Sequence, residues 1–327
     1  MNRRILIMAF LMTIVIPGVV YGKLNKWQEP QITQKTTILP EEERFCLTVI
    51  NEETAIEMEL EKYVECVLLG EIPSDFETET LNTQAVATRT YTIRKLGKNN
   101  KHEPGVMCTD STCCQAFCVP EKYLDMGGSA DYIARSREAV SQTNGEVLLY
   151  DGDLIEATYF SASGGRTEAA VEVWGKDIPY LQSVTSLGED AEQYEKHCIS
   201  FTHDDFLGKL NLLETHISRI SCSNILYTPG NGVKSMEICG KIYTGKQLRE
   251  LLQLPSTVFR ISVEEDTVNV VVDGNGHRVG MSQYGADAMA VQGKTYQEIL
   301  AHYYPGTNLR HMTFGELKGV FDKAGNL

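Results

Sequence analysis

Residues 60–95 read LEKYVECVLLGEIPSDFETETLNTQAVATRTYTIRK and predict two consecutive helices. Over about residues 57–69 the apolar side chains recur at helical spacing, so one face of the first helix is expected to be buried. A glycine ends that helix and Pro73 prevents its continuation, so the second helix is expected from about Ser74. This pair of helices leaves Glu71 at the connection between them.

Strands are expected on both sides of the helix pair. One is predicted at residues 44–50, RFCLTVI, and the Asp151-Gly152 pair predicts a tight hairpin turn between two more. Residues 258–307 predict two strands, a glycine-rich loop and two helices. Locally paired strands mixed with helices indicate an α+β class, with the candidate catalytic residues on the connections.

The composition is that of an ordinary globular protein. The chain has 327 residues, of which 42% are hydrophobic and 23% charged, enough for one large or two ordinary domains. The formal net charge is −14, which argues against nucleic acid as the main partner because phosphate binding needs a positive surface. It also argues against simple electrostatic adhesion to anionic lipid.

The first 22 residues resemble an export signal. Arg3 and Arg4 precede an uncharged apolar run from Ile5 to Tyr21, about the minimum length that crosses a bilayer. No small-x-small cleavage site precedes Lys23, which favours a retained anchor over a removed signal. The positive-inside tendency then places the rest of the chain outside the cytoplasm. A buried N-terminal core helix is the alternative.

The chain divides into four predicted segments. They are a membrane anchor at 1–22, a polar linker at 23–43, one mixed domain at 44–312 with a possible inserted subdomain at about 198–255, and a tail at 313–327.

Three separated segments carry a family resemblance. They are residues 67–95 (VLLGEIPSDFETETLNTQAVATRTYTIRK), 159–184 (YFSASGGRTEAAVEVWGKDIPYLQSV) and 276–307 (GHRVGMSQYGADAMAVQGKTYQEILAHYYPGT). In order and spacing they resemble the stage II sporulation protein D family, over roughly residues 45–310. The resemblance implies a peptidoglycan lytic transglycosylase that acts during forespore engulfment. It also implies an anchor in the mother-cell membrane, with the domain facing the space between mother cell and forespore.

The resemblance further implies partners and an alternative function. Peptidoglycan glycan strands would be the substrate, and a sporulation amidase and an integral membrane protein would be companions. Enhancers of cell-wall amidases share this domain, so a glycan-binding module that stimulates an amidase and cleaves nothing is the alternative. A zinc-stabilised structural protein of the envelope is a third reading.

Glu71 is the candidate catalytic residue. A lytic transglycosylase closes a 1,6-anhydro ring with the sugar's own 6-hydroxyl, so one carboxyl of raised pKa can act first as acid and then as base. Apolar neighbours on both sides would raise the pKa of Glu71. A solvated glutamate at a helix end is the alternative. Asp75, Glu77 and Glu79 are other carboxylates nearby, and a first helical turn explains them without catalysis.

The remaining motif positions are assigned to substrate binding. The positions expected to contact glycan are Gln84, Arg89, Tyr91, Ser161, Ser163, Gly164, Gly165, His277, Ser282, Gln283 and Tyr284. A salt bridge to a nearby carboxylate would equally explain Arg89, a tight turn would explain the SASGG segment, and a structural hydrogen bond would explain His277. Trp174 and Tyr180 could stack on sugar rings or belong to the core. Most family members have glycine in place of Arg278, so the loop conformation or the local charge should differ.

Serine hydrolase chemistry is disfavoured. The SASGG segment is not a G-x-S-x-G elbow, and no Ser-His-Asp or Cys-His set is indicated by spacing.

A metal site is expected at residues 101–118. His102, Cys108, Cys113 and Cys114 are spaced H-x5-C-x4-C-C, and some members of the family bind zinc on this connection. Zinc accepts thiolate and imidazole in tetrahedral geometry, and four protein ligands would make the site structural. Disulfides in an exported chain, or free buried thiols, are the alternatives. Cys118 has no assigned role.

Overall fold

The computed structural model describes residues 45–51, 54–98, 101–189, 191–213, 219–313, 315–317 and 319. Residues Glu41–Leu327 form one compact unit. The anchor and linker expected at residues 1–43 lie outside the described residues. Within the described part of the chain, no helix has the length and apolar character needed to cross a bilayer.

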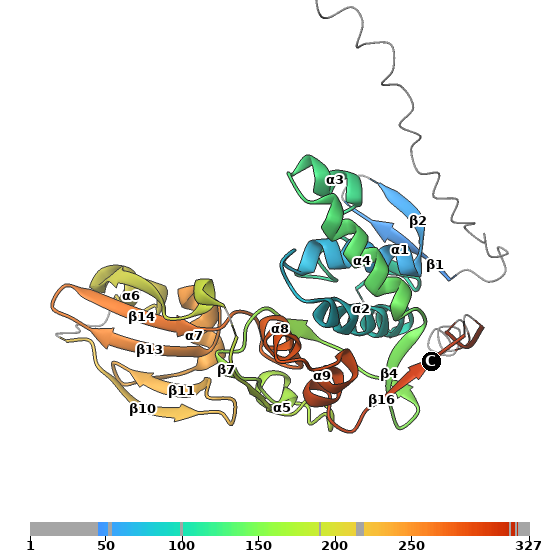
Figure 1. Ribbon diagram of the computed structural model, residues 1–327. Coiled ribbons are helices and arrows are strands. Elements are labelled where there is room, and N and C mark those ends of the chain that lie inside the picture. Colours follow the sequence, from blue (N-terminus) through green and yellow to red (C-terminus); the bar gives the residue numbers. More distant parts are fainter. Residues whose placement is uncertain are drawn as a thin grey trace, which may run out of the picture. The chain divides into compact units, whose positions relative to one another are not determined.

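A small sheet and a group of helices open the described chain (Figure 1). Their bounds are β1 (Cys46–Ile50), β2 (Ala55–Glu59), α1 (Leu60–Glu71), α2 (Thr78–Lys98), β3 (Val106–Cys108), α3 (Pro120–Asp125) and α4 (Ala130–Gln142). β1 pairs antiparallel with β2 and parallel with β3. α2 is the central element, because it contacts α1, α4, α8 and α9.

Both predicted helices of the opening segment exist, with later starts than expected. Residues 55–59 belong to β2, so α1 begins at Leu60. Residues 73–76 form a turn, in which the Phe76 N–H donates to the Pro73 carbonyl at 3.3 Å, and α2 begins only at Thr78. The Glu77 N–H donates to the carboxylate of Asp287, a distant residue, at 2.8 Å. Tertiary contacts therefore set this boundary.

The middle and the C-terminal end of the chain pack against α2. Their elements are β4 (Glu146–Tyr150), β5 (Asp153–Leu154), β6 (Tyr159–Phe160), β7 (Gly165–Arg166), α5 (Ala170–Trp174), β8 (Thr185–Ser186), β15 (Met281–Ser282), α8 (Gln283–Val291), α9 (Tyr296–Tyr303) and β16 (Asn308–His311). The predicted Asp151-Gly152 hairpin turn is confirmed between β4 and β5, with φ of 50° and 86°. β15 pairs in parallel with β6 and β16 pairs antiparallel with β4, so the two glycine-containing motifs lie side by side.

A second apolar core is built from residues between Phe206 and Val272. Its elements, with the 3₁₀ turn that precedes them, are Glu192–Tyr194, β9 (His197–Thr202), α6 (His203–Lys209), β10 (Cys222–Tyr227), β11 (Val233–Ile238), β12 (Lys241–Thr244), α7 (Gly245–Leu252), β13 (Val258–Val263) and β14 (Thr267–Asp273). β13, β14 and β9 form one sheet. The core therefore extends past residue 255, where the sequence suggests that the subdomain ends.

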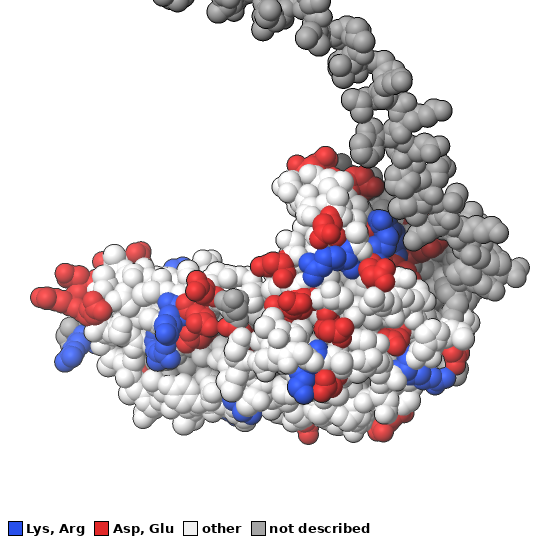
Figure 2. Space-filling model, viewed as in Figure 1, with Lys and Arg blue, Asp and Glu red and all other residues white. Residues whose placement is uncertain are grey.

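The mixture of helices with small sheets confirms the α+β class. On the face drawn in Figure 2, acidic side chains are scattered widely and basic side chains form only small groups between them. This face offers no broad basic surface for a nucleic-acid backbone.

Candidate functional site

Glu71 is the last residue of α1 and lies in a cavity of about 320 Å³. Tyr91, Ser161, His277 and Gln283 line the same cavity. The structure thus brings together side chains from α1, α2, the β6 loop and the α8 loop, all of which the sequence analysis had singled out. Among the described residues that line this cavity, Glu71 is the only carboxylate.

The surroundings of Glu71 favour its neutral form. Burial raises the pKa of Glu71 above its ordinary value, and two donors oppose that shift. The Ala116 N–H donates to Oε1 at 2.7 Å, and the Gln283 amide is close enough to lower the pKa. The buried Nε2 of Gln283 completes no hydrogen bond with any described residue. Glu71 is therefore a carboxyl of raised pKa with the Gln283 amide beside it.

Gly70 permits the contact that holds Glu71. A Cβ built on Gly70 would lie 2.8 Å from the Phe117 nitrogen and 2.9 Å from the Ala116 carbonyl carbon. These are backbone atoms and cannot rotate away. The absence of a side chain at residue 70 lets the loop approach α1 closely enough for the Ala116 N–H to reach Glu71.

Two polar residues of the cavity wall were missed by the sequence reasoning. The Gln115 Nε2 donates to the Tyr159 hydroxyl at 2.7 Å, and the Gln115 Oε1 accepts from Thr92 at 2.9 Å. Tyr159 also packs near Tyr91, with ring centroids 6.5 Å apart. Burial raises the pKa of both tyrosines, so both hydroxyls stay protonated and can donate. The position of Tyr159 two residues before the first serine of the SASGG motif was the available signal.

Gln84 and Arg89 do not reach the cavity, which corrects their assignment to substrate binding. Both side chains are fully buried in α2. The guanidinium of Arg89 donates to Glu61 at 2.6 and 2.8 Å and to the Glu146 carbonyl at 3.1 Å, so the salt-bridge alternative holds. The amide of Gln84 donates to Thr88 at 3.1 Å. These residues stabilise the helix packing around the site.

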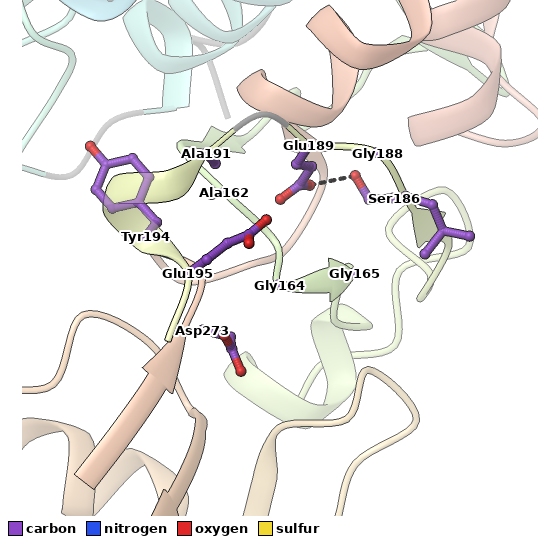
Figure 3. Close-up of a pocket in the computed structure, with 12 residues that line it drawn as sticks. Ala162, Gly164, Gly165, Ser186, Gly188, Glu189, Ala191, Tyr194, Glu195 and Asp273 are labelled. Carbon is purple, nitrogen blue, oxygen red and sulfur yellow. Dashed lines mark hydrogen bonds between the residues drawn. The ribbon is translucent and has the colours of Figure 1, made fainter. Parts of the chain in front are cut away.

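The SASGG segment divides between two hollows. Ser161 lines the Glu71 cavity, whereas Ser163 turns away and donates to Glu189 from its N–H at 2.9 Å and its hydroxyl at 2.7 Å. Gly164 and Gly165 adopt φ of 69° and 103°. They line a separate hollow of about 290 Å³ with Glu189 (Figure 3).

The partly buried carboxylate of Glu189 organises this region. It accepts hydrogen bonds at 2.7 Å from the hydroxyls of Ser186 and Ser282. Ser282 also caps α8 by accepting from the Gly285 N–H at 3.2 Å. Ser163 and Ser282 therefore position the two loops, and neither lines the Glu71 cavity.

Tyr284 packs beside the cavity instead of lining it. Its ring meets Phe76 edge-on at 4.9 Å and Tyr194 at 5.7 Å.

His277 lies between two aromatic rings. Its ring centroid is 5.7 Å from that of Phe160 and 5.6 Å from that of Trp174. Burial, aided by the positive charge of Arg249, lowers the pKa of His277 to about 4. The imidazole is therefore neutral at physiological pH, and its Nδ1 accepts from the Val279 N–H at 3.1 Å.

Arg278 adopts the backbone conformation that a glycine would favour. Its φ is 65°, in the left-handed region. The buried guanidinium donates to the carbonyls of Ser163 and Arg166 at 2.7 Å each and pairs with Glu168 at 3.1 Å. It also donates to the Gly230 carbonyl of the second core. The loop keeps its conformation, and the added positive charge points into the protein instead of the cavity.

The four predicted metal ligands come together. The ligand atoms of His102, Cys108, Cys113 and Cys114 all lie within 4.8 Å of one another, and the Cys113 Sγ is 3.3 Å from the His102 Nε2. Sulfurs around a tetrahedral zinc at ~2.3 Å would be ~3.8 Å apart, so the set fits a zinc ion with little rearrangement. Burial raises the pKa of the Cys114 thiol to about 12, which a bound cation would offset.

Two of these cysteines join the metal-ligand cluster to the Glu71 cavity. Cys113 and Cys114 line that cavity, and two residues later Ala116 donates to Glu71. Cys118 lies outside the ligand set, and its thiol donates to the Val119 carbonyl at 3.6 Å.

Comparison with known proteins agrees with this geometry. A family model described as "Stage II sporulation protein" (SpoIID) matches residues 50–150, which include Glu71 and all four cluster residues. Stage II sporulation protein D of Bacillus subtilis (strain 168) is 35% identical over 257 residues, covering 76% of this chain and 74% of that protein. The protein of the same name from Bacillus amyloliquefaciens gives the same identity and coverage.

A second kind of relative is also similar. An amidase enhancer of Bacillus subtilis (strain 168) is 30% identical over 298 residues, covering 74% of this chain and 39% of the enhancer. The similarity to the sporulation proteins extends over about three quarters of both chains. The chain belongs to the stage II sporulation protein D family.

Proposed function

We propose that this protein is a lytic transglycosylase that cleaves the bond between N-acetylmuramic acid and N-acetylglucosamine in peptidoglycan. One observation carries the proposal: Glu71, with a raised pKa, is the only carboxylate among the described residues that line its cavity. Ordinary glycosidases need two carboxylates, because a water or an enzyme nucleophile takes part. An intramolecular reaction needs only one carboxylate, because the sugar's own 6-hydroxyl is the nucleophile.

In the proposed reaction, the protonated Glu71 donates its proton to the glycosidic oxygen as the bond to the muramyl C1 breaks. The resulting carboxylate then removes the proton of the muramyl 6-hydroxyl, and O6 bonds to C1 to close the 1,6-anhydro ring. Glu71 ends protonated, as it began. The Ala116 N–H at 2.7 Å stabilises the carboxylate between the two transfers.

The neighbours of Glu71 suit an amide- and hydroxyl-rich sugar. The unpartnered Nε2 of Gln283 can donate to a substrate oxygen, and the hydroxyls of Tyr91 and Ser161 face the same cavity. His277 contributes a neutral wall, because its lowered pKa keeps it uncharged. A buried polar donor without a protein partner gains most from a ligand that supplies one.

We further propose that His102, Cys108, Cys113 and Cys114 hold a structural zinc ion. Four protein ligands would complete its coordination, so the ion would supply folding stability to the loop and no activated water. The loop that binds the ion would then act by positioning, because it carries the Ala116 N–H that contacts Glu71.

The cellular setting is proposed from the family and the N-terminal sequence. Residues 1–22 would anchor the protein in the mother-cell membrane, with residues 23–327 in the intermembrane space. A sporulation amidase and an integral membrane protein would be its companions. Similarity to an amidase enhancer favours one alternative function, the stimulation of a cell-wall amidase without cleavage.

The test is product analysis. Purified protein is incubated with glycan strands stripped of peptides, and chain ends are identified by mass spectrometry. Wild-type protein should release 1,6-anhydro-muramic ends, and Glu71→Gln should reduce the rate of their release by about 10²–10⁴-fold. Glu77→Gln is the matched control, since Glu77 is exposed and does not line the cavity, and should keep full activity.

Two outcomes would contradict the proposal. Equal product from wild type and Glu71→Gln would remove Glu71 from the mechanism. No anhydro product from the wild type, together with stimulation of an added amidase, would establish the alternative function.

A further inference from the structure

A second, larger cavity lies next to the Glu71 cavity. Its volume is about 710 Å³, within the ~300–1,000 Å³ typical of ligand sites. α5 contributes Trp174 to its wall, and α7 and the strands of the second core contribute much of the rest. His277 lines both cavities. A bound chain could therefore pass from one cavity to the other beside the His277 ring.

The aromatic wall continues between the two cavities. Phe160 lines the Glu71 cavity, Trp174 lines the second cavity, and His277 contacts both rings. Trp174 is 43% exposed although it is a large aromatic residue, whereas Tyr180, the other stacking candidate, is buried. An accessible indole in a cavity is suited to packing against the apolar face of a sugar ring.

One face of α7 brings positive charge into this cavity. Lys246 and Arg249 are three residues apart, and both line it, so they lie on the same face of the helix. The positive charge of Arg249 is also felt by His277, as its lowered pKa indicates. The Nε of Arg249 donates to the Leu254 carbonyl at 3.2 Å, which leaves its terminal nitrogens for a ligand.

Two of the three acidic residues that line the cavity already form ion pairs. Glu168 pairs with Arg278 at 3.1 Å, and Glu172 pairs with Lys234 at 2.9 Å. Within the described residues, neither Lys246 nor Arg249 forms an ion pair. Glu250 is the remaining acidic residue of the wall. In a chain of net charge −14, two cations that form no ion pair among the described residues and lie beside an accessible tryptophan indicate an anionic, ring-containing ligand, although Glu250 offsets part of the positive charge of Arg249.

We propose that this second cavity is a subsite for a muramyl residue of the glycan strand, in which Trp174 packs on the pyranose ring and Lys246 and Arg249 bind a carboxylate. N-acetylmuramic acid carries a lactyl ether that ends in a carboxyl group, whereas N-acetylglucosamine is neutral. The same carboxylate chemistry occurs on the stem peptide of an unstripped strand. The inference rests on the proposed function in one respect, namely that the strand is peptidoglycan.

The experiment measures binding and not cleavage, so that the subsite and the reaction are tested separately. All measurements use Glu71→Gln protein and isothermal titration calorimetry. Three probes of equal sugar length are compared: a stripped oligosaccharide with free lactyl carboxylates, a peptide-bearing oligosaccharide, and a neutral oligomer of N-acetylglucosamine. Lys246→Gln, Arg249→Gln and the double substitution are made in this background.

Lys241→Gln is the matched control. Lys241 is an exposed cation of the same subdomain that does not line the cavity, and its ammonium lies 5.0 Å from the Tyr243 ring centroid.

A carboxylate that binds Lys246 and Arg249 should make the stripped probe bind about tenfold or more tightly than the neutral probe, since charged hydrogen bonds contribute ~1.5–3 kcal/mol. The double substitution should remove that preference and leave the neutral probe unchanged, and Lys241→Gln should alter neither. Arg249→Lys should retain part of the preference. Thermal unfolding of each variant verifies its fold, and exposed Lys246 gives a variant expected to fold normally.

The remaining outcomes are also decisive. A loss of affinity for the stripped probe assigns the lactyl carboxylate, and a loss confined to the peptide-bearing probe assigns a peptide carboxylate. Either result supports the subsite. Unchanged affinity for both acidic probes in the double variant, or an equal loss for the neutral probe, overturns it. Failure of the wild type to form anhydro ends would refute the proposed reaction and leave these binding results standing.

Discussion

Gly70→Ala should destabilise this protein, although helix propensity alone predicts the opposite. Gly70 is the penultimate residue of α1, and alanine is favoured over glycine in a helix by about 1 kcal/mol. The new Cβ would lie 2.8–2.9 Å from backbone atoms of residues 116 and 117, and the loop would have to move by several tenths of an ångström. Overpacking against atoms that cannot rotate costs about 1–3 kcal/mol.

The expected net change is a loss of up to about 2 kcal/mol in the free energy of unfolding, since the gain in helix propensity offsets about 1 kcal/mol of the overpacking cost. Gly208→Ala is the matched control. Gly208 is also helical, and its added Cβ would meet the flexible Leu213 Cδ1 at 3.4 Å. This substitution should stabilise the protein by about 0.5–1 kcal/mol.

The same displacement should change the pKa of Glu71, the proposed acid. The Ala116 N–H donates to Glu71 at 2.7 Å and lowers its pKa against the rise that burial causes. When the loop moves away, the carboxylate loses this donor and the pKa of Glu71 rises. A weakening of 1.4 kcal/mol corresponds to about one pH unit. The acid form then persists to higher pH, so the alkaline limb of the pH–rate profile should move upward while the maximal rate falls.

Two measurements test the predicted loss of stability and the predicted shift of the pH profile in Gly70→Ala. Urea unfolding followed by circular dichroism gives the change in the free energy of unfolding. The rate of release of anhydro-muramic ends between pH 5 and about 9 gives the position of the alkaline limb of the pH–rate profile. A Gly70→Ala protein that is as stable as the wild type, with the same pH profile, would refute the close-approach argument. That result would mean that the loop moves away from the added Cβ without lowering the free energy of unfolding.

Other substitutions test the neighbouring contacts. Arg278→Met should lower the free energy of unfolding by about 3–5 kcal/mol, because Glu168 would be left buried without its partner. The exposed pair of Arg310 is the control, and Arg310→Met should cost less than about 1 kcal/mol in the same urea titration. Elemental analysis should find about one zinc ion per chain, and chelation should lower both the melting temperature and the activity. Cys108→Ser should lose the metal and Cys118→Ser should retain it; metal-free protein that is fully folded and active would contradict the zinc proposal.

Local sequence was enough to locate several features. Apolar spacing and Pro73 placed Glu71 at the end of a helix, and Asp151-Gly152 specified a turn whose φ values few other residues adopt. The four predicted metal ligands span only residues 102–114, so chain connectivity alone keeps them close. These features depend on backbone preferences and short-range spacing, which a single sequence carries.

Other assignments depended on what packs against each element. Arg89 and Tyr91 lie on the same helix within one motif, yet Arg89 is enclosed by Glu61 and Glu146 while Tyr91 lines the cavity. Ser161 and Ser163 share one motif, yet Ser161 lines the Glu71 cavity and Ser163 donates hydrogen bonds to Glu189. No local sequence pattern distinguishes these neighbours. Which side of a helix or loop is buried depends on the elements that pack against it, and those elements lie far away in the sequence.

The sequence by itself predicted Glu71 as the candidate acid, four candidate metal ligands, and the fold class of this protein. Only the tertiary structure decided which motif residues face the cavity, why Gly70 must lack a side chain, and that Arg278 turns inward. It also placed Trp174 beside Lys246 and Arg249 to form the second cavity. The physical reason is that burial, close approach and charge compensation are properties of contacts between distant segments, and those contacts exist only once the chain has folded.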